Sequence, residues 1–552
     1  MPIRLIEKAP SAYQFPLLVR HLLHTALAAS PRQEIVYRDQ LRYSYLELNR
    51  RIGRLATGLA DIGVAQGSTV AIMDWDSHRY LESYFAVPMM GAVLMTVNIR
   101  LSSEQIFYTL NHSRAEFLMM HRDFLPILAQ IRPRLPHLRA CVLMADGCGT
   151  DRSGTDGFVA EYEDLIATHR REFTFEDFDE NAMATSYYTT GTTGMPKAVA
   201  YSHRQLVLHT LGSLSALASP AFGQSFRHGD VYMPLTPMFH AHAWGVPYIA
   251  TVLGVKQVYS GRYDPEMILK LKRDEGANFS HCVPTILAMI LTSPSAQATD
   301  LRGWKMLIGG AALSDALARS ALERGIDVWS GYGMSETGPI IVLTRITAAG
   351  LPGEADADVP IRCKQGLPIP LVELRVVDEA MQDVAHDGHS IGEVVVRAPW
   401  LTMAYGRDEK ASAELWRGGY LHTQDAATID ADGYLQIADR MKDMIKSGGE
   451  WMSSLLLEDL ISRHVQVAEV AVLGIKDEHW GERPMALVVP KPEFVAVLTA
   501  ASIKQHMTSF VEKGDINKHD VPERIEIVEV IEKTSVGKLN KKLIRERLAG
   551  LR

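Results

Sequence analysis

The chain has 552 residues, of which 47% are hydrophobic and 22% charged, and its formal net charge is −8. A chain of this length exceeds a single hydrophobic core, so we expect a globular protein with two or more domains. The chain is acidic overall and has no basic block, which argues against a nucleic-acid binder. An anionic substrate can still bind where positive side chains gather locally.

Cysteine usage and apolar stretches indicate where the protein resides. No CxxC pair occurs, so free thiols in a reducing, cytoplasmic setting are expected. The first residues carry early charges and no uninterrupted apolar core, which predicts no secretory signal. The most apolar stretch, 84–97, is broken by Pro88 and is too short to span a bilayer, so we expect no transmembrane segment. The four cysteines are Cys141, Cys148, Cys282 and Cys363.

Alternating helical and extended patterns run through the first 330 residues. Apolar positions at helical spacing over 44–65 precede an extended run at 67–76, and 84–97 is interpreted as a buried helix leading into a core strand. Similar alternation follows at 103–121, 161–166 and 183–189, and it repeats between 200 and 330. This order predicts βαβ units and largely parallel sheets, the arrangement of an α/β domain.

The pattern changes after residue 370. Residues 371–397 alternate apolar and polar positions, which predicts a small antiparallel β subdomain or β-barrel within 371–437. Beyond Asp439, helical patterns at 453–463 and 501–513, three strands and a basic C-terminal helix predict a compact α+β module. We therefore expect a large N-terminal domain at 1–439 and a small domain at 440–552.

The segment YTTGTTGMPK at 188–197 is the most informative in the chain. Its backbone N–H groups and hydroxyls can converge on phosphate oxygens, and its two glycines permit close approach. Lys197 adds a point charge. The Walker pattern does not fit, because Pro196 stands where it requires a second glycine and Ala198 follows the lysine.

Four further motifs are GYGMSET at 331–337, YLHTQDAATIDADG at 420–433, ADRMKDMIKSGGEWMSS at 438–454 and TSVGKLNKK at 534–542. In this order, the set resembles the adenylate-forming enzymes, which comprise acyl- and aryl-CoA synthetases, luciferases and adenylation domains. The resemblance covers nearly the whole chain. SGGEW followed by two serines is most similar to bacterial medium- and long-chain fatty acyl-CoA synthetases.

The resemblance implies a two-step reaction with ATP, Mg²⁺ and coenzyme A. A carboxylic acid is converted to acyl-AMP, and a mobile C-terminal domain then rotates about a hinge at Lys442 to allow thioester formation. Glu336 is a hard carboxylate suited to magnesium bound with phosphates, and by resemblance Thr189 shares that ion. Tyr332 is expected to stack on adenine.

The resemblance also implies that Asp425 binds both ribose hydroxyls with help from Arg440. The whole set expected to bind ATP or AMP is Thr189, Thr190, Gly191, Thr192, Thr193, Gly194, Lys197, Trp244, Gly310, Ala311, Ser330, Gly331, Tyr332, Gly333, Ser335, Asp425, Arg440, Lys442 and Lys446.

The remaining site residues also follow from the resemblance. Lys538, with Lys197 and His240, is expected to be catalytic, because a mobile ammonium can bridge the carboxylate and the α-phosphate and then leave. The pantetheine tunnel is expected at Gly448, Gly449 and Trp451, where the glycine pair has no side chains to block a thiol. The expected acyl pocket comprises His240, Trp244, Val283 and Met334.

The acid itself is less closely defined. The pocket segments are mainly apolar and lack a cation for a second carboxylate, which favours a medium-chain fatty, branched or alicyclic acid. An aryl acid of the benzoate or cinnamate type is the first alternative. Loading of a carrier protein and a non-catalytic nucleotide-binding scaffold are further alternatives, and the intact SGGEW, Glu336 and Lys538 argue against them. The pair His240 and His242 lacks further ligands for zinc.

Two partners are expected, a second copy of the chain and a modifying enzyme. The resemblance implies a homodimer. A lysine acetyltransferase acting on Lys538 would remove the cation that adenylation uses.

Overall fold

The computed structural model describes residues 3–147, 157–169, 171–189, 195–220, 224–346, 355–447, 450–477, 479–514, 516–533 and 539–549. Eight residues assigned to the site from the sequence lie outside these ranges: Thr190, Gly191, Thr192, Thr193, Gly194, Gly448, Gly449 and Lys538.

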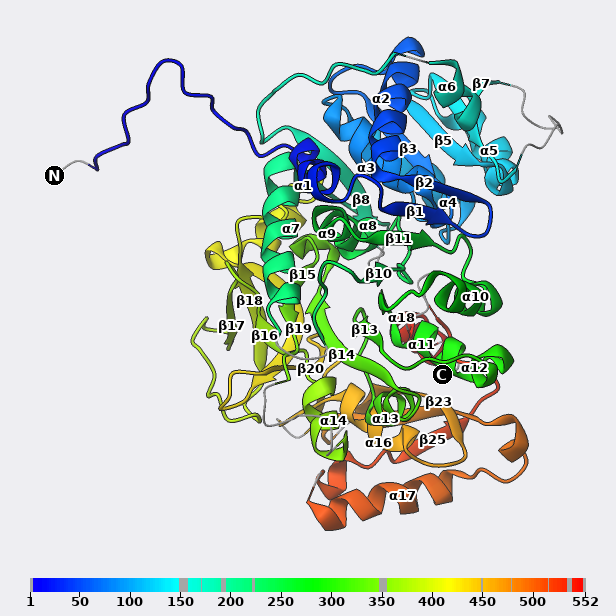
Figure 1. The fold of residues 1–552 in the computed structure, drawn as a ribbon. Coiled ribbons are helices and arrows are strands. Elements are labelled where there is room, and N and C mark those ends of the chain that lie inside the picture. Colours follow the sequence, from blue (N-terminus) through cyan, green and yellow to red (C-terminus); the bar gives the residue numbers. More distant parts are fainter. Residues whose placement is uncertain are drawn as a thin grey trace.

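A seven-stranded sheet forms the first layer, in the order β7-β6-β5-β3-β4-β8-β9, and lies at the top of Figure 1. All neighbouring strands in this sheet are parallel except β8 and β9, which are antiparallel. The parallel βαβ units predicted from the sequence are therefore confirmed. The strands are β3 (Thr69–Met73), β4 (Val93–Thr96), β5 (Phe117–His121), β6 (Ala140–Met144), β7 (Phe158–Glu161), β8 (Met183–Thr189) and β9 (Lys197–Ser202).

Helices with identifiable start signals connect these strands. Ser102 begins α4 with a capping box in which its hydroxyl accepts from the Gln105 amide, and Ser202 and Gln205 do the same for α7. The helix expected at 84–97 is α3, which leads into β4 as predicted. The helices of this part are α1 (His24–Ala29), α2 (Tyr45–Asp61), α3 (His78–Met89), α4 (Ser103–Ser113), α5 (Leu125–Ile131), α6 (Tyr162–Thr168) and α7 (His203–Ala218).

A second, nine-stranded sheet has the order β16-β15-β14-β13-β12-β10-β11-β1-β2. Its central strands are parallel, and antiparallel pairs close both ends. The strands are β1 (Glu34–Tyr37), β2 (Leu41–Ser44), β10 (Val231–Tyr232), β11 (Lys256–Tyr259), β12 (Phe279–Cys282), β13 (Trp304–Ile308), β14 (Ile326–Gly333), β15 (Ile340–Leu343) and β16 (Leu367–Pro368). Its helices are α8 (Ala241–Trp244), α9 (Val246–Leu253), α10 (Pro265–Glu275), α11 (Pro284–Thr292), α12 (Pro294–Ala298), α13 (Asp315–Glu323) and α14 (Ala355–Cys363).

The antiparallel subdomain is also present. Its four strands form the sheet β17-β18-β19-β20, drawn in yellow tones in Figure 1, with β17 (Glu373–Val377), β18 (Gly392–Arg397), β19 (Leu421–Ile429) and β20 (Leu435–Arg440). The barrel form of the prediction is corrected, because in the described part of the chain β17 and β20 are the two edges of an open sheet. One face packs on the second sheet in a shared core that includes Val394, Trp329 and Ile341. Helix α15 (Glu409–Leu415) precedes β19.

The C-terminal module has its own sheet, β22-β21-β24-β23, with β25 pairing to β24, and it lies at the bottom of Figure 1. Its strands are β21 (Ile445–Ser447), β22 (Glu450–Met452), β23 (Val467–Asp477), β24 (Gly481–Pro490) and β25 (Arg524–Ile527). Its helices are α16 (Ser454–Ser462), α17 (Ala500–Lys513) and α18 (Lys541–Ala549). A separate apolar core includes Leu457, Val472 and Met507, which confirms the predicted α+β module.

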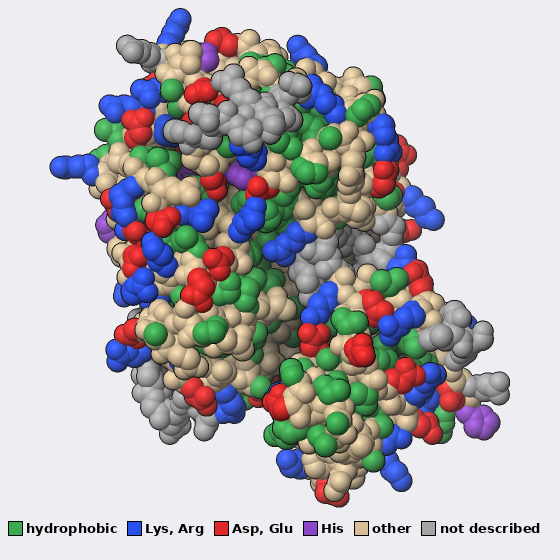
Figure 2. Space-filling model, turned by 90° about the vertical axis from the view of Figure 1, so that its right-hand side faces the viewer, with side chains coloured by type: hydrophobic (Ala, Val, Ile, Leu, Met, Phe, Trp, Pro, Cys, Tyr) green, Lys and Arg blue, Asp and Glu red, His purple; other side chains and the backbone are tan. Residues whose placement is uncertain are grey.

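Figure 2 shows one face of the molecule, hollowed between the upper body and the lower lobe. Cationic and anionic side chains are interspersed over this face, and neither sign forms a continuous patch there. In the described ranges, every helix is too short or too polar to cross a membrane.

Candidate functional site

The phosphate-loop segment forms the connection between β8 and β9, at an edge of the first sheet. Thr189 and Lys197 are paired in register at the loop end of this hairpin, so the two predicted ligands that flank the loop lie opposite each other. The ammonium of Lys197 lies 4.6 Å from the centre of the Tyr405 ring. The hairpin therefore presents one hydroxyl and one cation together.

Two phenols connect this hairpin to the motif at 331–337. Tyr187 on β8 donates a hydrogen bond of 3.2 Å to the carbonyl oxygen of Ser335, and Tyr201 on β9 donates to the same oxygen. Their rings stack with centroids 5.6 Å apart. Sequence reasoning missed both residues, although a signal existed. Side chains at even spacings along a strand lie on the same face of the sheet. Tyr187 therefore lies on the face of Thr189, and Tyr201 lies on the face of Lys197.

Glu336, the predicted magnesium ligand, is buried beside the hairpin. Its Oε1 accepts a hydrogen bond of 2.7 Å from the phenol of Tyr405, and its carbonyl oxygen accepts one of 3.0 Å from the Thr402 amide. Burial raises the pKa of the Glu336 carboxyl, and the Tyr405 hydrogen bond opposes that rise. Tyr405 thus contacts both Glu336 and Lys197, and the sequence analysis did not identify it.

The donor set around Glu336 suits a shared magnesium ion. The described ranges contain no cluster of three or more His, Cys, Asp or Glu side chains that could hold a metal by themselves. Magnesium usually binds through one or two carboxylates together with substrate phosphates and water. One carboxylate that Tyr405 connects to Lys197 fits an ion that arrives with a nucleotide.

Three residues predicted to bind the nucleoside come together from the end of β14, the middle of β19 and the end of β20. Tyr332 donates a hydrogen bond of 2.6 Å to Asp425 Oδ2, and Arg440 Nε lies 2.8 Å from Asp425 Oδ1. Asp425 and Arg440 are partners in the register of β19 and β20. The carboxylate raises the pKa of Arg440, while burial followed by the same carboxylate raises that of Tyr332. Two donors, Tyr332 and Arg440, therefore orient the Asp425 carboxyl group.

The glycines of GYGMSET have a packing role in addition to the predicted nucleotide contact. A Cβ on Gly333 would lie 1.8 Å from the Pro339 carbonyl oxygen, and one on Gly331 would lie 2.9 Å from Leu343 Cδ2. Ser330, on the same strand, is buried, and its hydroxyl has no hydrogen-bond partner among the described residues. That hydroxyl is free to bind a ligand, as the sequence assignment requires.

Trp244, which is predicted to line the acyl pocket, lies in an unusual turn. Ala241, His242, Ala243 and Trp244 all have positive φ, at 46°, 53°, 48° and 59°, and Gly245 continues at 73°. A left-handed conformation costs an L-residue about 1–2 kcal/mol. Four in succession therefore persist only where the surroundings fix them.

This turn seats Trp244 against a glycine surface. A Cβ on Gly309 would lie 3.0 Å from Trp244 Cη2, and one on Gly310 would lie 3.2 Å from Val283 Cγ1. Trp244 is buried in the same apolar cluster as Met334. The structure thus brings together Trp244, Val283 and Gly310, with Ala311 next in the chain. Half-buried His240 immediately precedes the turn.

His242 has a different environment from His240. It is buried, its Nε2 lies 2.8 Å from Thr185 Oγ1, and its ring stacks on Tyr84 with centroids 4.4 Å apart. Burial lowers the pKa of His242 to about 3, so the ring is neutral at ordinary pH. This enclosed position supports the sequence argument against a zinc site at the His-x-His pair.

The segment after β20 carries the predicted hinge and tunnel residues. Lys442 is exposed, and its pKa is lowered by partial burial and by neighbouring cations that include Arg440. Lys446 lies 4.9 Å from the centre of the Trp451 ring. Lys446 and Trp451 thus contact each other in this structure, whereas the predicted role of Lys446 at the nucleotide is not tested by it.

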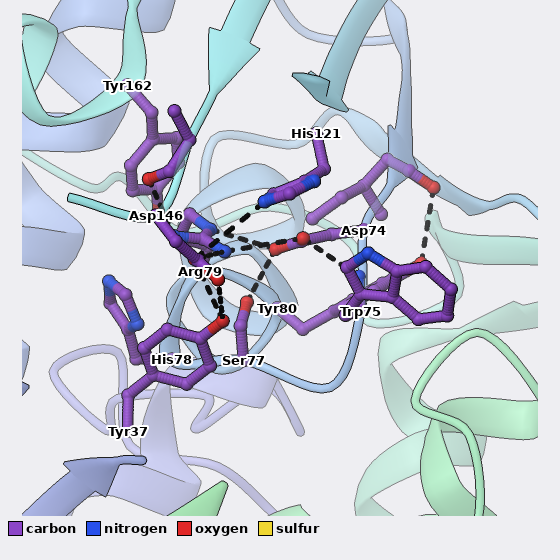
Figure 3. Close-up of polar contacts among 12 residues, drawn as sticks. Tyr37, Asp74, Trp75, Ser77, His78, Arg79, Tyr80, His121, Asp146 and Tyr162 are labelled. Atoms are coloured by element: carbon purple, nitrogen blue, oxygen red, sulfur yellow. Dashed lines mark hydrogen bonds and ion pairs between the residues drawn. The ribbon is translucent and has the colours of Figure 1, made fainter. Parts of the chain in front are cut away.

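A buried polar network near the first sheet was also missed (Figure 3). Arg79 Nε donates to Asp74 Oδ2 over 2.8 Å and its Nη2 to Asp146 Oδ1 over 3.0 Å, while Tyr37 donates to the same Asp146 over 2.8 Å. Ser77 donates to Asp74 over 2.6 Å. Tyr37 belongs to β1 of the second sheet, so this network joins the two sheets and fixes the loop between β3 and α3.

Comparison with known proteins agrees with this geometry. The profile of the AMP-binding enzyme family matches residues 23–406, and that of the AMP-binding enzyme C-terminal domain matches residues 456–538. The long-chain-fatty-acid–CoA ligase of Thermus thermophilus is 39% identical over 534 residues, which cover 95% of this chain and 94% of that relative. The medium-chain-fatty-acid–CoA ligase of Ectopseudomonas oleovorans is 33% identical over 509 residues, which cover 92% of this chain and 90% of that relative.

A solved structure shares the fold over nearly the whole length. The anthranilate CoA ligase AuaEII in complex with anthranoyl-AMP matches with a TM-score of 0.84 at 24% identity, and the match covers 98% of this chain and 99% of that one. The fold is therefore that of the adenylate-forming enzymes, a large domain of parallel α/β sheets with a small C-terminal domain. The chain belongs to the AMP-binding enzyme family.

Proposed function

We propose that the protein is an AMP-forming acyl-CoA synthetase. The observation that supports the proposal is a set of contacts that links the predicted ligands Lys197, Glu336 and Asp425 with neighbouring tyrosines, and Thr189 is paired with Lys197 in the β8–β9 hairpin. Tyr405 contacts both Lys197 and Glu336, and Tyr332 connects motif 331–337 to Asp425. These residue types match the charges of a nucleoside triphosphate.

The chemistry has two balanced steps. The substrate carboxylate attacks the α-phosphorus of ATP, which forms acyl-AMP and releases pyrophosphate. The CoA thiol then attacks the acyl carbon, AMP leaves and one proton is released. The first step concentrates negative charge on one phosphorus, so preorganised cations and N–H donors stabilise its transition state.

Each site residue has a proposed part in the first step. Asp425, with Tyr332 and Arg440, binds and orients the nucleoside. Lys197 and the loop between β8 and β9 bind phosphate oxygens. Glu336 and Thr189 would hold Mg²⁺, which when bound supplies positive charge to the phosphates.

The acyl group is proposed to lie against Trp244, Val283 and Met334, with His240 near its carboxylate. The apolar character of this wall favours a medium-chain fatty, branched or alicyclic acid. The two relatives are named for long- and medium-chain fatty acids, which supports a fatty acid over an aryl acid.

The second step is proposed to use a rotation of residues 440–552 against 1–439 about Lys442. Lys538 would act in adenylation, and Gly448, Gly449 and Trp451 would line the pantetheine tunnel. The Ser454 amide donates a hydrogen bond of 2.9 Å to Asp439 Oδ2. This bond joins the two proposed domains, and a rotation would break it. We further propose that the protein forms a homodimer. Acetylation of Lys538 is proposed to abolish acyl-AMP formation.

The test is a panel of C2 to C16 fatty, branched, alicyclic and aryl acids with ATP and Mg²⁺, in which AMP and thioester are measured with and without CoA. The proposal predicts CoA-dependent thioester formation that peaks on medium-chain or alicyclic acids. Thioester formation with aryl acids alone would show that the substrate is an aryl acid and not a fatty, branched or alicyclic acid. Pyrophosphate release without a CoA thioester for any acid would overturn the synthetase and indicate carrier-protein loading.

A further inference from the structure

The backbone that leads into the left-handed turn is held by side chains of the first sheet. The Met238 amide donates to Asp76 Oδ1 over 2.8 Å, and the Met238 carbonyl oxygen accepts from the phenol of Tyr84. The next carbonyl oxygen, that of Phe239, accepts from Thr96 Oγ1 over 2.7 Å. Three backbone groups of two successive residues are thus bound by buried side chains from β4, α3 and the loop before α3.

Asp76 is the acidic member of this set, and its own position is fixed on both sides. The adjoining Asp74 is held by Ser77 and Arg79 in the network of Figure 3. The carbonyl oxygen of Asp76 accepts from the Gly261 amide over 2.9 Å, and its Oδ2 accepts from Tyr263 over 2.7 Å. Asp76 is 4% exposed, so its side chain holds the Met238 amide in a fixed position.

The Met238 amide lies three residues before the left-handed turn begins at Ala241. A run of left-handed residues reverts to commoner conformations unless both of its ends are fixed. Gly245 and helix α9 fix the C-terminal end. Asp76, Tyr84 and Thr96 fix the N-terminal end, so the position of Trp244 over Gly309 and Gly310 depends on them.

We propose that Asp76 is a positioning residue for acyl selectivity, which acts through the Met238 amide to hold the turn that seats Trp244 against Gly309. The inference rests on the proposed function, because it takes Trp244 as a wall of the acyl pocket. It assigns Asp76 no contact with the acid, the nucleotide or CoA. Loss of the Asp76–Met238 bond should therefore alter which acids bind and change nucleotide binding much less, because Asp425, Tyr332 and Arg440 are proposed to hold the nucleoside.

The test compares kcat and KM over the C2 to C16 acid series for the wild type and Asp76→Ala. The variant is expected to raise KM for the preferred acid by about fivefold or more, the effect of one lost buried hydrogen bond, and to flatten the chain-length profile. KM for ATP should stay within about twofold. Asp76→Asn keeps an acceptor for Met238 and should restore the profile.

Two further variants separate the proposed path from general damage. Tyr263→Phe removes the partner of the other Asp76 oxygen without touching the Met238 bond, and it should leave the profile unchanged. Trp244→Ala combined with Asp76→Ala should add little to Trp244→Ala alone, because residues acting through one another are non-additive. If Asp76→Ala fails to fold, Thr96→Val tests the same segment through Phe239 and should change the profile in the same direction.

An unchanged acid profile in a folded Asp76→Ala protein would overturn the proposal, as would full additivity with Trp244→Ala. An equal rise of KM for ATP and acid would also overturn it. These outcomes are distinct from failure of the proposed function, which would appear as absence of thioester formation in the wild type.

Discussion

The phenol of Tyr405 donates a 2.7 Å hydrogen bond to the carboxylate of Glu336, and its ring faces the ammonium of Lys197. Tyr405, from the segment between β18 and β19, thereby contacts both the carboxylate proposed to bind Mg²⁺ and the ammonium proposed to bind phosphate. This segment is itself anchored on the phosphate hairpin, because the Gly406 amide donates to the Ala198 carbonyl oxygen over 2.9 Å.

Tyr405→Phe removes the hydrogen bond to Glu336 and keeps the ring against Lys197. A hydrogen bond to a charged group is worth about 1.5–3 kcal/mol, so we expect about a tenfold higher Mg²⁺ requirement for acid-dependent pyrophosphate release. The measurement is the initial rate against Mg²⁺ at fixed ATP. Tyr405→Leu, which also removes the ring, should lower the rate further. Equal Mg²⁺ curves for Tyr405→Phe and the wild type would contradict this role.

Asp425→Ala removes the acceptor shared by Tyr332 and Arg440. Both donors then lose a charged partner, and we expect nucleotide affinity to fall by about 10- to 100-fold. Isothermal titration with AMP measures this directly. Tyr332→Phe, which removes only one donor, is the matched control and should lose about tenfold or less. Unchanged AMP binding in Asp425→Ala would place the nucleoside elsewhere.

Lys541 is a buried cation of the C-terminal module, with its Nζ 2.7 Å from Glu458 Oε1. Removing one partner of a buried pair leaves the other charge uncompensated, at a cost of about 3–5 kcal/mol. Lys541→Met should therefore lower the melting temperature of the module clearly. Its neighbour Lys542 is exposed and lies 3.5 Å from Glu546, so Lys542→Met should have little effect. Similar melting of the two variants would show that the buried pair does not stabilise the module.

Asp76 makes stability depend on pH. Burial raises the pKa of its carboxyl to about 7, against the opposing hydrogen bonds from Met238 and Tyr263 and the charge of Arg100, while Asp74 adds to the rise. The usual value is 3.8, so between these values the folded protein binds more protons than the unfolded chain. Stability from this group is therefore lost as pH rises through that window.

Asp76→Asn has no such titration. Its melting temperature relative to the wild type should rise between pH 5 and pH 8, as measured by thermal denaturation in matched buffers. A difference that is constant with pH would contradict a raised pKa at Asp76.

Much of the fold was predictable because its signals are local. Helix–strand alternation predicted the parallel sheets, and the motif at 188–197 predicted a loop whose flanks, Thr189 and Lys197, are indeed paired. The meeting of Tyr332, Asp425 and Arg440 followed from the resemblance and has a physical basis in the β19–β20 register.

Other features depend on long-range packing and could not be read from the sequence. Tyr405 reaches Glu336 across 69 positions in the chain. The left-handed turn carries three L-residues before Trp244 and no glycine until Gly245, so its local sequence favours an ordinary helix. The side chains that hold the preceding backbone, Asp76 among them, and helix α9 on the other side explain why the turn persists.

The most direct test of the central claim is acid-dependent exchange of labelled pyrophosphate into ATP, measured without CoA. If the residues around Glu336 and Asp425 form acyl-AMP reversibly, label should enter ATP only when a suitable acid is present, and Asp425→Ala should reduce its rate. Thioester formation without exchange, accompanied by release of ADP and phosphate, would contradict an acyl-adenylate and with it the proposed chemistry of the site.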